Sequence, residues 1–340
     1  MGTKNRAKVQ KTRHKIRHKI RNKILWITDP WETLDHRRDT TLRLMEEAQL
    51  AGLTQWWCSV RSIRLEGSQV VFDAKKVLSV DPERSLKSFR FGPVQVSAPK
   101  NFTSIHYRTD PPVDLSYLQP LQLLEFGLRG CRSTELINPA SVLFQLNEKF
   151  EATALGKVMP PSLVSSQWEH LLQFGQKEQR TVLKPLHEAQ SHGIELLDWT
   201  TPTGVKQAKV KIQTLSNQFS TPVLLQRYLE EIDEGETRLW FLDGQLLATV
   251  KKLPLPGDFR VDIDQGSLLA PTQLTPKQQR WVAPIAKHLK SHKIRLAAVD
   301  LIGDRLTDFN FTSPGLITLM EKTLQRNLAR EIIHKLYAPK

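Results

Sequence analysis

Hydrophobic and polar residues alternate over residues 306–311, near the end of the chain. A period of two places Asp308 and Asn310 on one face of a strand. It places Phe309 and Phe311 on the opposite face, which we expect to be buried. The pattern therefore predicts a strand with one polar face and one core face.

The apolar run 296–301 and a Gly303-Asp304 turn precede this strand, so the segment predicts a hairpin in which Asp300 can reach the polar face. Together with Asp308 and Asn310, Asp300 supplies hard oxygen ligands, which suit Mg²⁺ or Mn²⁺ shared with a phosphate substrate. An ordinary solvated hairpin face would show the same spacing, so the pattern alone leaves both interpretations open.

The first half of the chain alternates strands and helices. An apolar strand at residues 24–28 is followed by Asp39, a good N-cap, and by a helix that stops at Gly52. A second strand lies within residues 103–114, and a third, with a proline turn and a helix, lies within residues 133–155. Such units predict a mainly parallel sheet with ligands at the carboxyl ends of its strands.

After Pro160 the pattern becomes rich in strands, at residues 181–186, 222–229 and 237–253, with a hairpin turn at Asp243-Gly244. Two predicted helices accompany these strands.

The first of these helices is capped by Thr275, with Pro276 in its first turn. The second is expected to start at Ser313-Pro314. Its apolar face would be formed by Leu316, Met320, Leu324 and Leu328.

Length and composition are those of a soluble globular protein. The 340 residues suffice for two or three domains, and 39% of them are hydrophobic and 25% charged. No apolar run approaches the roughly 18 residues that span a bilayer. Cys58 and Cys131 form neither a disulfide framework nor a metal-ligand cluster, which favours a reducing, cytoplasmic location.

Positive charge is concentrated in an N-terminal arm, residues 1–22. Residues 1–23 hold ten Lys or Arg and no acid, which leaves only +4 of the net charge of +14 to the rest of the chain. The repeat HKIRHKIRNKIL would align Ile16, Ile20 and Ile24 on one side of a helix. Such an arm could contact nucleic acid or an anionic membrane surface, or it could be a disordered extension.

Six motifs follow one another between about Lys23 and Leu328. They are DP with RRDTTLRLMEEAQLAG, RTDPPVD, LINPASVLFQLNEK, LKPL, LQRYLEEIDEGETRLWFLDG and VDLIGDRLTDFNFTSP. In order and spacing they resemble the prokaryotic glutathione synthetases of the ATP-grasp superfamily.

The resemblance implies an α/β protein with the ATP-grasp fold. Residues 23–145 would form an N-terminal parallel α/β (pre-ATP-grasp) substrate domain, and residues 146–340 an ATP-grasp domain. The latter would comprise two α+β subdomains: a small nucleotide lid at about 146–225, and a metal and substrate subdomain at 226–340.

The resemblance also implies roles for individual residues. Mg²⁺ ions bridging the ATP phosphates would be held by Asp300, Asp308 and Asn310, with Asp308 standing where the family commonly has Glu. The nucleotide would be contacted by Lys149, Lys184, Gln226, Tyr228 and Leu229. Arginines near the reacting groups would be Arg238 and Arg260. Substrate-side positions would be Asp110, Lys252 and Ser313, where Lys252 replaces an arginine and loses its planar fork.

The reaction implied by the resemblance activates a carboxylate. ATP would phosphorylate the carboxylate of γ-glutamylcysteine to an acyl phosphate, and glycine would then displace phosphate to leave an amide. Such a site needs cations on the transferring phosphoryl group and closure against water. The family also implies a homo-oligomer.

Two loops depart from the family pattern. The glycine-rich loop after LKP reads LHEAQSHGI here, residues 186–194, with Glu188 where a negative charge would repel a triphosphate. The second loop reads FRVDIDQGSLL, residues 259–269, with Asp262 in place of Asn.

Two functions therefore stay open. The first, which we favour because the metal and lysine positions are intact, is a working ATP-dependent carboxylate-amine ligase, with γ-glutamylcysteine-like and glycine-like substrates. The second is a degenerate ATP-grasp protein that binds nucleotide or a partner without efficient catalysis.

Overall fold

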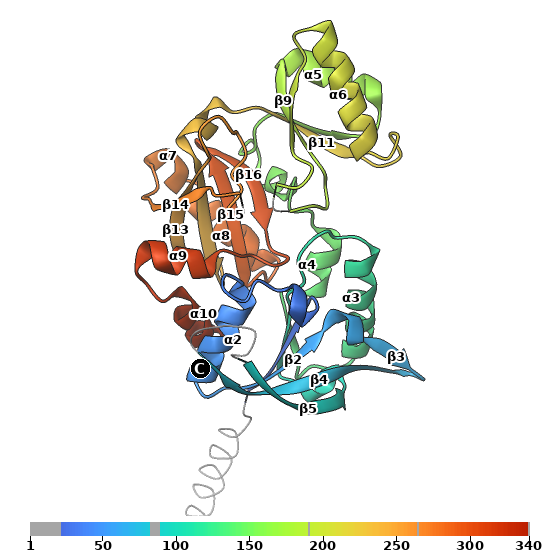
Figure 1. The fold of residues 1–340 in the computed structure, drawn as a ribbon, viewed down its shortest axis with the longest axis vertical. Helices are drawn as coiled ribbons and strands as arrows, with labels where there is room; N and C mark the ends of the chain where they lie inside the picture. The colour runs from blue at the N-terminus through green and yellow to red at the C-terminus, as the bar shows by residue number, and fades with distance from the viewer. Residues whose placement is uncertain (1–21, 82–88, 190, 264, 339–340) are drawn as a thin grey trace, which may run out of the picture.

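The computed structural model describes residues 22–81, 89–189, 191–263 and 265–338, whose strands form three sheets (Figure 1). Of the N-terminal arm it describes only Asn22, whose side-chain amide donates to the backbone carbonyl of Tyr337, 3.4 Å away. The predictions for the rest of the arm lie outside the described residues.

The first sheet has seven strands. They are β1 (Lys23–Thr28), β2 (Thr54–Ser59), β3 (Arg64–Glu66), β4 (Gln69–Val80), β5 (Phe89–Ser97), β6 (Ser104–Tyr107) and β7 (Glu135–Ile137). Their order is β3-β4-β2-β1-β6-β7, with β5 paired to β4. The predicted parallel part is present, because β1 runs parallel to β2 and β6, and β6 to β7. The sheet is nevertheless mixed, because β3, β4 and β5, which were not predicted, pair antiparallel.

The helices that follow the parallel strands are α2 (Thr40–Leu50), α3 (Leu115–Leu128) and α4 (Ala140–Gln145). The predicted cap of α2 is confirmed, since the Asp39 carboxylate accepts from the Leu42 amide at 2.8 Å. The chain leaves this helix through Gly52, whose φ of +70° is the left-handed conformation that glycine tolerates best.

The second sheet is small and antiparallel, and lies at the top of Figure 1. Its strands, in the order β10-β9-β11-β8, are β8 (Ser162–Ser165), β9 (Arg180–Lys184), β10 (Glu195–Asp198) and β11 (Val223–Arg227). Two helices pack on it, α5 (Trp168–Glu178) and α6 (Pro202–Leu215), neither of which was predicted. This unit has its own core, which includes Leu171, Leu183, Trp199, Ile212 and Leu225.

The third sheet is antiparallel, in the order β14-β13-β12-β15-β16. Its strands are β12 (Glu236–Leu242), β13 (Gln245–Leu253), β14 (Leu268–Pro271), β15 (Leu296–Ile302) and β16 (Arg305–Asn310), with helices α7 (Pro276–Gln279) and α8 (Val282–Ser291). The predicted hairpin is confirmed: Asp300 lies directly across from Asp308, and Phe309 and Phe311 are fully buried. The predicted Thr275 cap of α7 is also present, as part of a capping box.

The prediction of a single helix starting at Ser313 is wrong. The structure has two helices there, α9 (Ile317–Leu324) and α10 (Leu328–Tyr337). Gln325 adopts a left-handed conformation with φ of 50°, which ends α9, and the Asn327 side chain caps α10 by accepting from the Arg330 amide. None of the helices in the described ranges combines the length and hydropathy needed to cross a membrane.

Candidate active site

A pocket of about 570 Å³ is lined by residues from all three sheets and their loops. Every site residue predicted from the sequence lines it: Asp110, Lys149, Lys184, Gln226, Tyr228, Leu229, Arg238, Lys252, Arg260, Asp300, Asp308, Asn310 and Ser313. The fold thus brings together positions that are up to 203 residues apart in the sequence. Their individual roles stay predictions.

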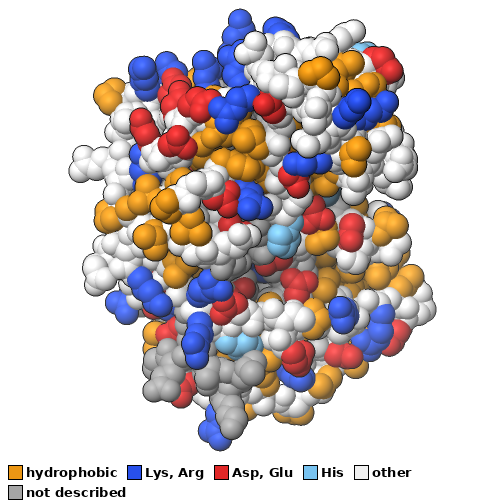
Figure 2. Space-filling model, turned by 45° about the horizontal axis from the view of Figure 1, so that its top comes forward, with side chains coloured by type: hydrophobic (Ala, Val, Ile, Leu, Met, Phe, Trp, Pro, Cys, Tyr) orange, Lys and Arg blue, Asp and Glu red, His pale blue; other side chains and the backbone are white. Residues whose placement is uncertain are grey.

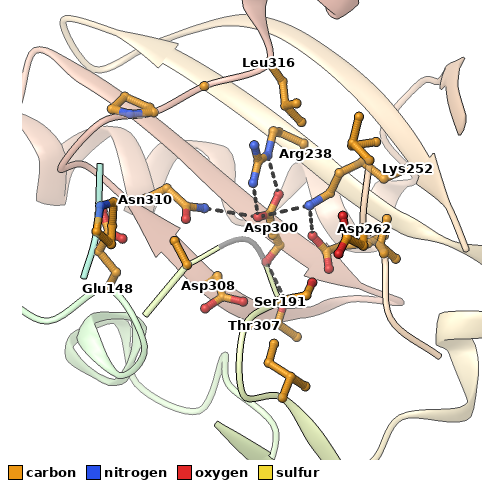
Figure 3. A pocket seen from close by; sticks show the side chains of 18 of the residues that line it. Glu148, Ser191, Arg238, Lys252, Asp262, Asp300, Thr307, Asp308, Asn310 and Leu316 are labelled. Atoms are coloured by element: carbon orange, nitrogen blue, oxygen red, sulfur yellow. Dashed lines mark hydrogen bonds and ion pairs between the residues drawn. The ribbon is translucent and has the colours of Figure 1, made fainter. Parts of the chain in front are cut away.

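Asp300 lies at the centre of the charged end of this pocket (Figure 3). Arg238 donates to both of its oxygens, at 2.8 Å and 2.6 Å, and the Lys252 ammonium lies 3.3 Å from Oδ2. The Asn310 amide also donates to Oδ2, at 3.1 Å. Burial alone would raise the pKa of Asp300, but the two cations outweigh it and hold the pKa far below its usual value.

Asp308 carries the second cluster of charges. The Lys149 ammonium lies 2.8 Å from its Oδ1, and the Lys184 ammonium lies 3.3 Å from its Oδ2. Here too burial would raise the pKa of the carboxyl, and the lysines lower it by more. Both lysines are themselves more than nine-tenths buried. They are therefore not the solvated surface charges that isolated lysines usually are.

Glu236 is a pocket residue that was not predicted from the sequence. It forms an ion pair with Lys252. Burial and the nearby charge of Asp300 raise its pKa, against the opposing effect of Lys252. A signal was present: Glu236 and Arg238 are two residues apart on β12, so they share a face of the strand.

Glu148 was also missed, although it directly precedes Lys149. Its Oε1 accepts from the backbone amides of Phe311 and Thr312, at 2.6 Å and 2.7 Å, and from the Thr312 hydroxyl at 2.9 Å. Glu148 therefore holds Phe311 and Thr312, the two residues after Asn310, in place. This is a long-range contact, and nothing in the sequence spacing indicates it.

Asp110 lines the part of the pocket nearest the first sheet. The residue is exposed to the solvent of the pocket, although many protein atoms surround its carboxyl. Its backbone amide donates to Asp29 at 2.9 Å. Burial and the charge of Asp39 raise its pKa to about 6, against a hydrogen bond from Ser313.

This pKa gives a pH-dependent stability. A carboxyl whose pKa is higher in the folded than in the unfolded protein opposes folding increasingly as pH rises from its unfolded pKa, near 3.8, through about 6. Asp110→Asn, which stays neutral, should therefore become more stable relative to the wild type between pH 4 and pH 7. Urea unfolding at both pH values measures the difference. A difference that does not change with pH would contradict the raised pKa.

A less polar end of the pocket is formed by β9, β11 and the loops after them. The Gln226 side chain is buried and donates to the Ser162 hydroxyl at 3.1 Å. The ring of Tyr228 lies under the Arg180 guanidinium, 4.2 Å away, and edge-on to Phe259. With Leu229 these groups form a wall of flat and apolar surfaces beside an amide, which suits a planar heterocycle.

The two loops that depart from the family pattern both reach the pocket, through Ala189, Ser191 and Ile194, and through Arg260 to Ile263. Arg260 does not contact the charged cluster. Its guanidinium is held by Asp258 in its own loop, at 3.1 Å and 3.0 Å.

The donor set around Asp300 fits a hard cation. Asp300 and Asp308 supply carboxylate oxygens, and the Asn310 amide nitrogen faces Asp300, which leaves its carbonyl oxygen for a metal. Four cations already neutralise the two aspartates, so a divalent ion alone would be repelled. A metal that arrives with a triphosphate would give these cations new anionic partners.

Figure 2 shows one face of the molecule, on which basic and acidic side chains are interspersed with apolar ones.

Comparison with known proteins gave two family matches. Residues 23–142 match the N-terminal domain of prokaryotic glutathione synthetase, and residues 148–325 match the ATP-grasp domain of the same enzyme. The chain is 27% identical over 312 residues to a glutathione synthetase of Prochlorococcus marinus subsp. pastoris, covering 92% of this chain and 98% of that protein.

Solved structures share the fold at lower identity. D-cycloserine synthetase DcsG superposes with a TM-score of 0.60 at 19% identity, over 92% of this chain and all of that one. The ATP-grasp ligase PsnB, solved with a precursor variant, Mg and ADP, gives a TM-score of 0.60 at 14% identity, over 93% of this chain and 98% of that one.

Proposed function

Because the chain belongs to the prokaryotic glutathione synthetase family, we propose that it is an ATP-dependent ligase that joins a γ-glutamylcysteine-type carboxylate to glycine or a similar amine. The γ-phosphoryl group of ATP would pass to a carboxylate oxygen, giving an acyl phosphate and ADP. The amine nitrogen would then attack the carbonyl carbon, phosphate would leave, and the nitrogen would lose a proton.

The observation that best supports this proposal is the pairing of four cations with two aspartates at one end of the pocket. Asp300 and the three lysines are buried, and the side chains of Arg238 and Asp308 are 12% and 15% exposed. Lys149 and Lys184 come from different elements and converge on Asp308, where they would neutralise phosphate oxygens. The Arg238 fork would stabilise charge on the transferring group.

Mg²⁺ would be held by Asp300, Asp308 and Asn310, and it would neutralise phosphate oxygens during the transfer. PsnB, which shares the fold, was solved with Mg and ADP. Adenine would occupy the slot beside Gln226, Tyr228 and Leu229, because that wall combines apolar surface with hydrogen-bonding groups.

The acid substrate would enter from the side of Asp110 and Ser313.

The two loops that depart from the family pattern would affect the turnover rate. Fewer glycines in residues 186–194 and 259–269 mean fewer backbone amides able to approach phosphate, so we expect slower turnover than in relatives with glycine-rich loops.

The test is an incubation of the purified chain with Mg²⁺-ATP, γ-glutamylcysteine and a panel of amines that includes glycine, following phosphate release and product mass. Lys184→Met should lower the rate by about 10²–10³-fold, as expected when a charge-stabilising group is lost. Lys211→Met removes a lysine on α6 that pairs with Glu195 near the surface, and it should leave the rate unchanged.

The outcomes separate the candidate functions. Product with glycine would establish the proposed activity. Product only with another amine would mean that the enzyme has a different amine specificity, which we would attribute to the altered loops. Tight ATP binding without product from any pair would leave the degenerate nucleotide-binding protein.

A further inference from the structure

Three potential metal ligands lie close together outside the pocket, on the side of β16 opposite Asp308. They are Glu151, which starts the short helix η4 (Glu151–Leu155), His288 on α8, and His292, which follows α8. One ligand atom from each lies within 4.8 Å of the others. We propose that these residues bind a divalent transition metal ion of the Zn²⁺ type, independently of the nucleotide site.

The two histidines have a spacing that suits a metal site on a helix. Residues i and i+4 share one face of a helix, and their rings lie 4.4 Å apart between centroids. Nδ1 of His292 lies 3.1 Å from the His288 carbonyl oxygen. If Nδ1 donates to this carbonyl, Nε2 keeps its lone pair, which is how a backbone carbonyl commonly orients a metal-binding histidine.

His288 lacks the hydrogen bond that a buried ring nitrogen normally has. Its side chain is only 9% exposed, and Nε2 makes no hydrogen bond of acceptable geometry, although Glu151 Oε1 lies 2.9 Å away. Leaving such an atom unsatisfied is costly. A metal ion between this nitrogen and the carboxylate would satisfy both, since two ligands of a tetrahedral Zn²⁺ lie about 3.3 Å apart when each bond is about 2.0–2.1 Å long.

The ligand types distinguish this site from the pocket. Two imidazoles and one carboxylate favour Zn²⁺, Co²⁺ or Ni²⁺, whereas the oxygen ligands of the pocket favour Mg²⁺. The carbonyl end of α8 adds a partial negative charge beside the histidines. Phe309, edge-on to His288, points away from the face of β16 that carries Asp308. The ion would therefore join η4 and α8 on the opposite face of the strand.

The test uses Co²⁺ as a spectroscopic probe on the full chain after treatment with a chelator. We expect one equivalent of Co²⁺ to give visible absorption bands of low-symmetry coordination, and Zn²⁺ to abolish them and raise the melting temperature. His292→Ala removes a ligand near the surface and should weaken binding by at least about 100-fold, the upper end of what loss of a mere supporting group costs. His288→Gln should do the same.

The chain offers a matched control, because His14 and His18 in the basic arm have the same spacing. Replacing both by alanine should leave the bands unchanged. The proposal fails if no Co²⁺ binds, or if binding is lost in the arm variant and kept in His292→Ala. It also fails if His292→Ala binds as tightly as the wild type. Glu151 and His288 would then be no more than a buried acid and histidine in contact.

Discussion

Asp308→Ala should lower the affinity for Mg²⁺-ATP by at least about 100-fold, because it would remove a charged ligand from the proposed cation site and the partner of the two lysines that would contact phosphate. Calorimetry with Mg²⁺-ATP measures this loss directly. Asp308→Glu should retain most of the affinity, since glutamate is the residue that we expect in the family at this position.

The structure adds a stability effect that the hairpin pattern alone does not indicate. Lys149 and Lys184 are buried around Asp308. Removing this partner leaves buried charge uncompensated, which typically costs about 3–5 kcal/mol. Urea unfolding without nucleotide should show this loss for Asp308→Ala.

Asp304→Ala is the matched control. Asp304 lies at the turn of the same hairpin and pairs with the more exposed Arg280. Its removal should change the free energy of unfolding by no more than about 1 kcal/mol, and should leave Mg²⁺-ATP affinity as it is. If Asp308→Ala also binds Mg²⁺-ATP normally, the hairpin is a polar face without a metal function.

Gly175→Ala should lower the free energy of unfolding of the unit formed by β8 to β11, α5 and α6 by about 3 kcal/mol, the upper end of the usual cost of overpacking. Gly175 lies on α5 against the indole of Trp199, and an added Cβ would lie 2.2 Å from two ring atoms. The indole cannot easily retreat, because it is buried and its Nε1 donates to the Thr181 hydroxyl at 2.8 Å.

Gly92→Ala is the control for this substitution, since its Cβ would meet nothing closer than 3.8 Å. Urea unfolding of both variants gives the comparison. Because β9 and β11 of the same sheet carry Lys184 and Gln226, we also expect Gly175→Ala to weaken ATP binding. Equal stability of the two variants would mean that α5 shifts away from Trp199 at little cost.

Sequence alone determined the elements whose signals are local. The alternation over residues 306–311 specified which side chains of β16 are buried, because successive residues of a strand point to opposite faces. Asp39 and Thr275 marked helix starts because a capping side chain bonds to amides only two or three residues away. The order of the six motifs was sufficient to indicate the family and its fold.

Features that depend on distant contacts were decided by the tertiary structure. The break at Gln325 was mispredicted because it has no strong local signal. The strands β4 and β5 were missed although their runs of Val and Phe are a local strand signal. Their antiparallel pairing, with each other and with β2, depends on distant contacts. The sequence also indicated which residues share the pocket, but not how their charges pair. Lys252 pairs with Glu236, and two lysines pair with Asp308. Each pair forms because the packing of distant elements brings the two opposite charges to within about 3 Å of each other. The spacing of these residues along the sequence does not indicate which charges will pair.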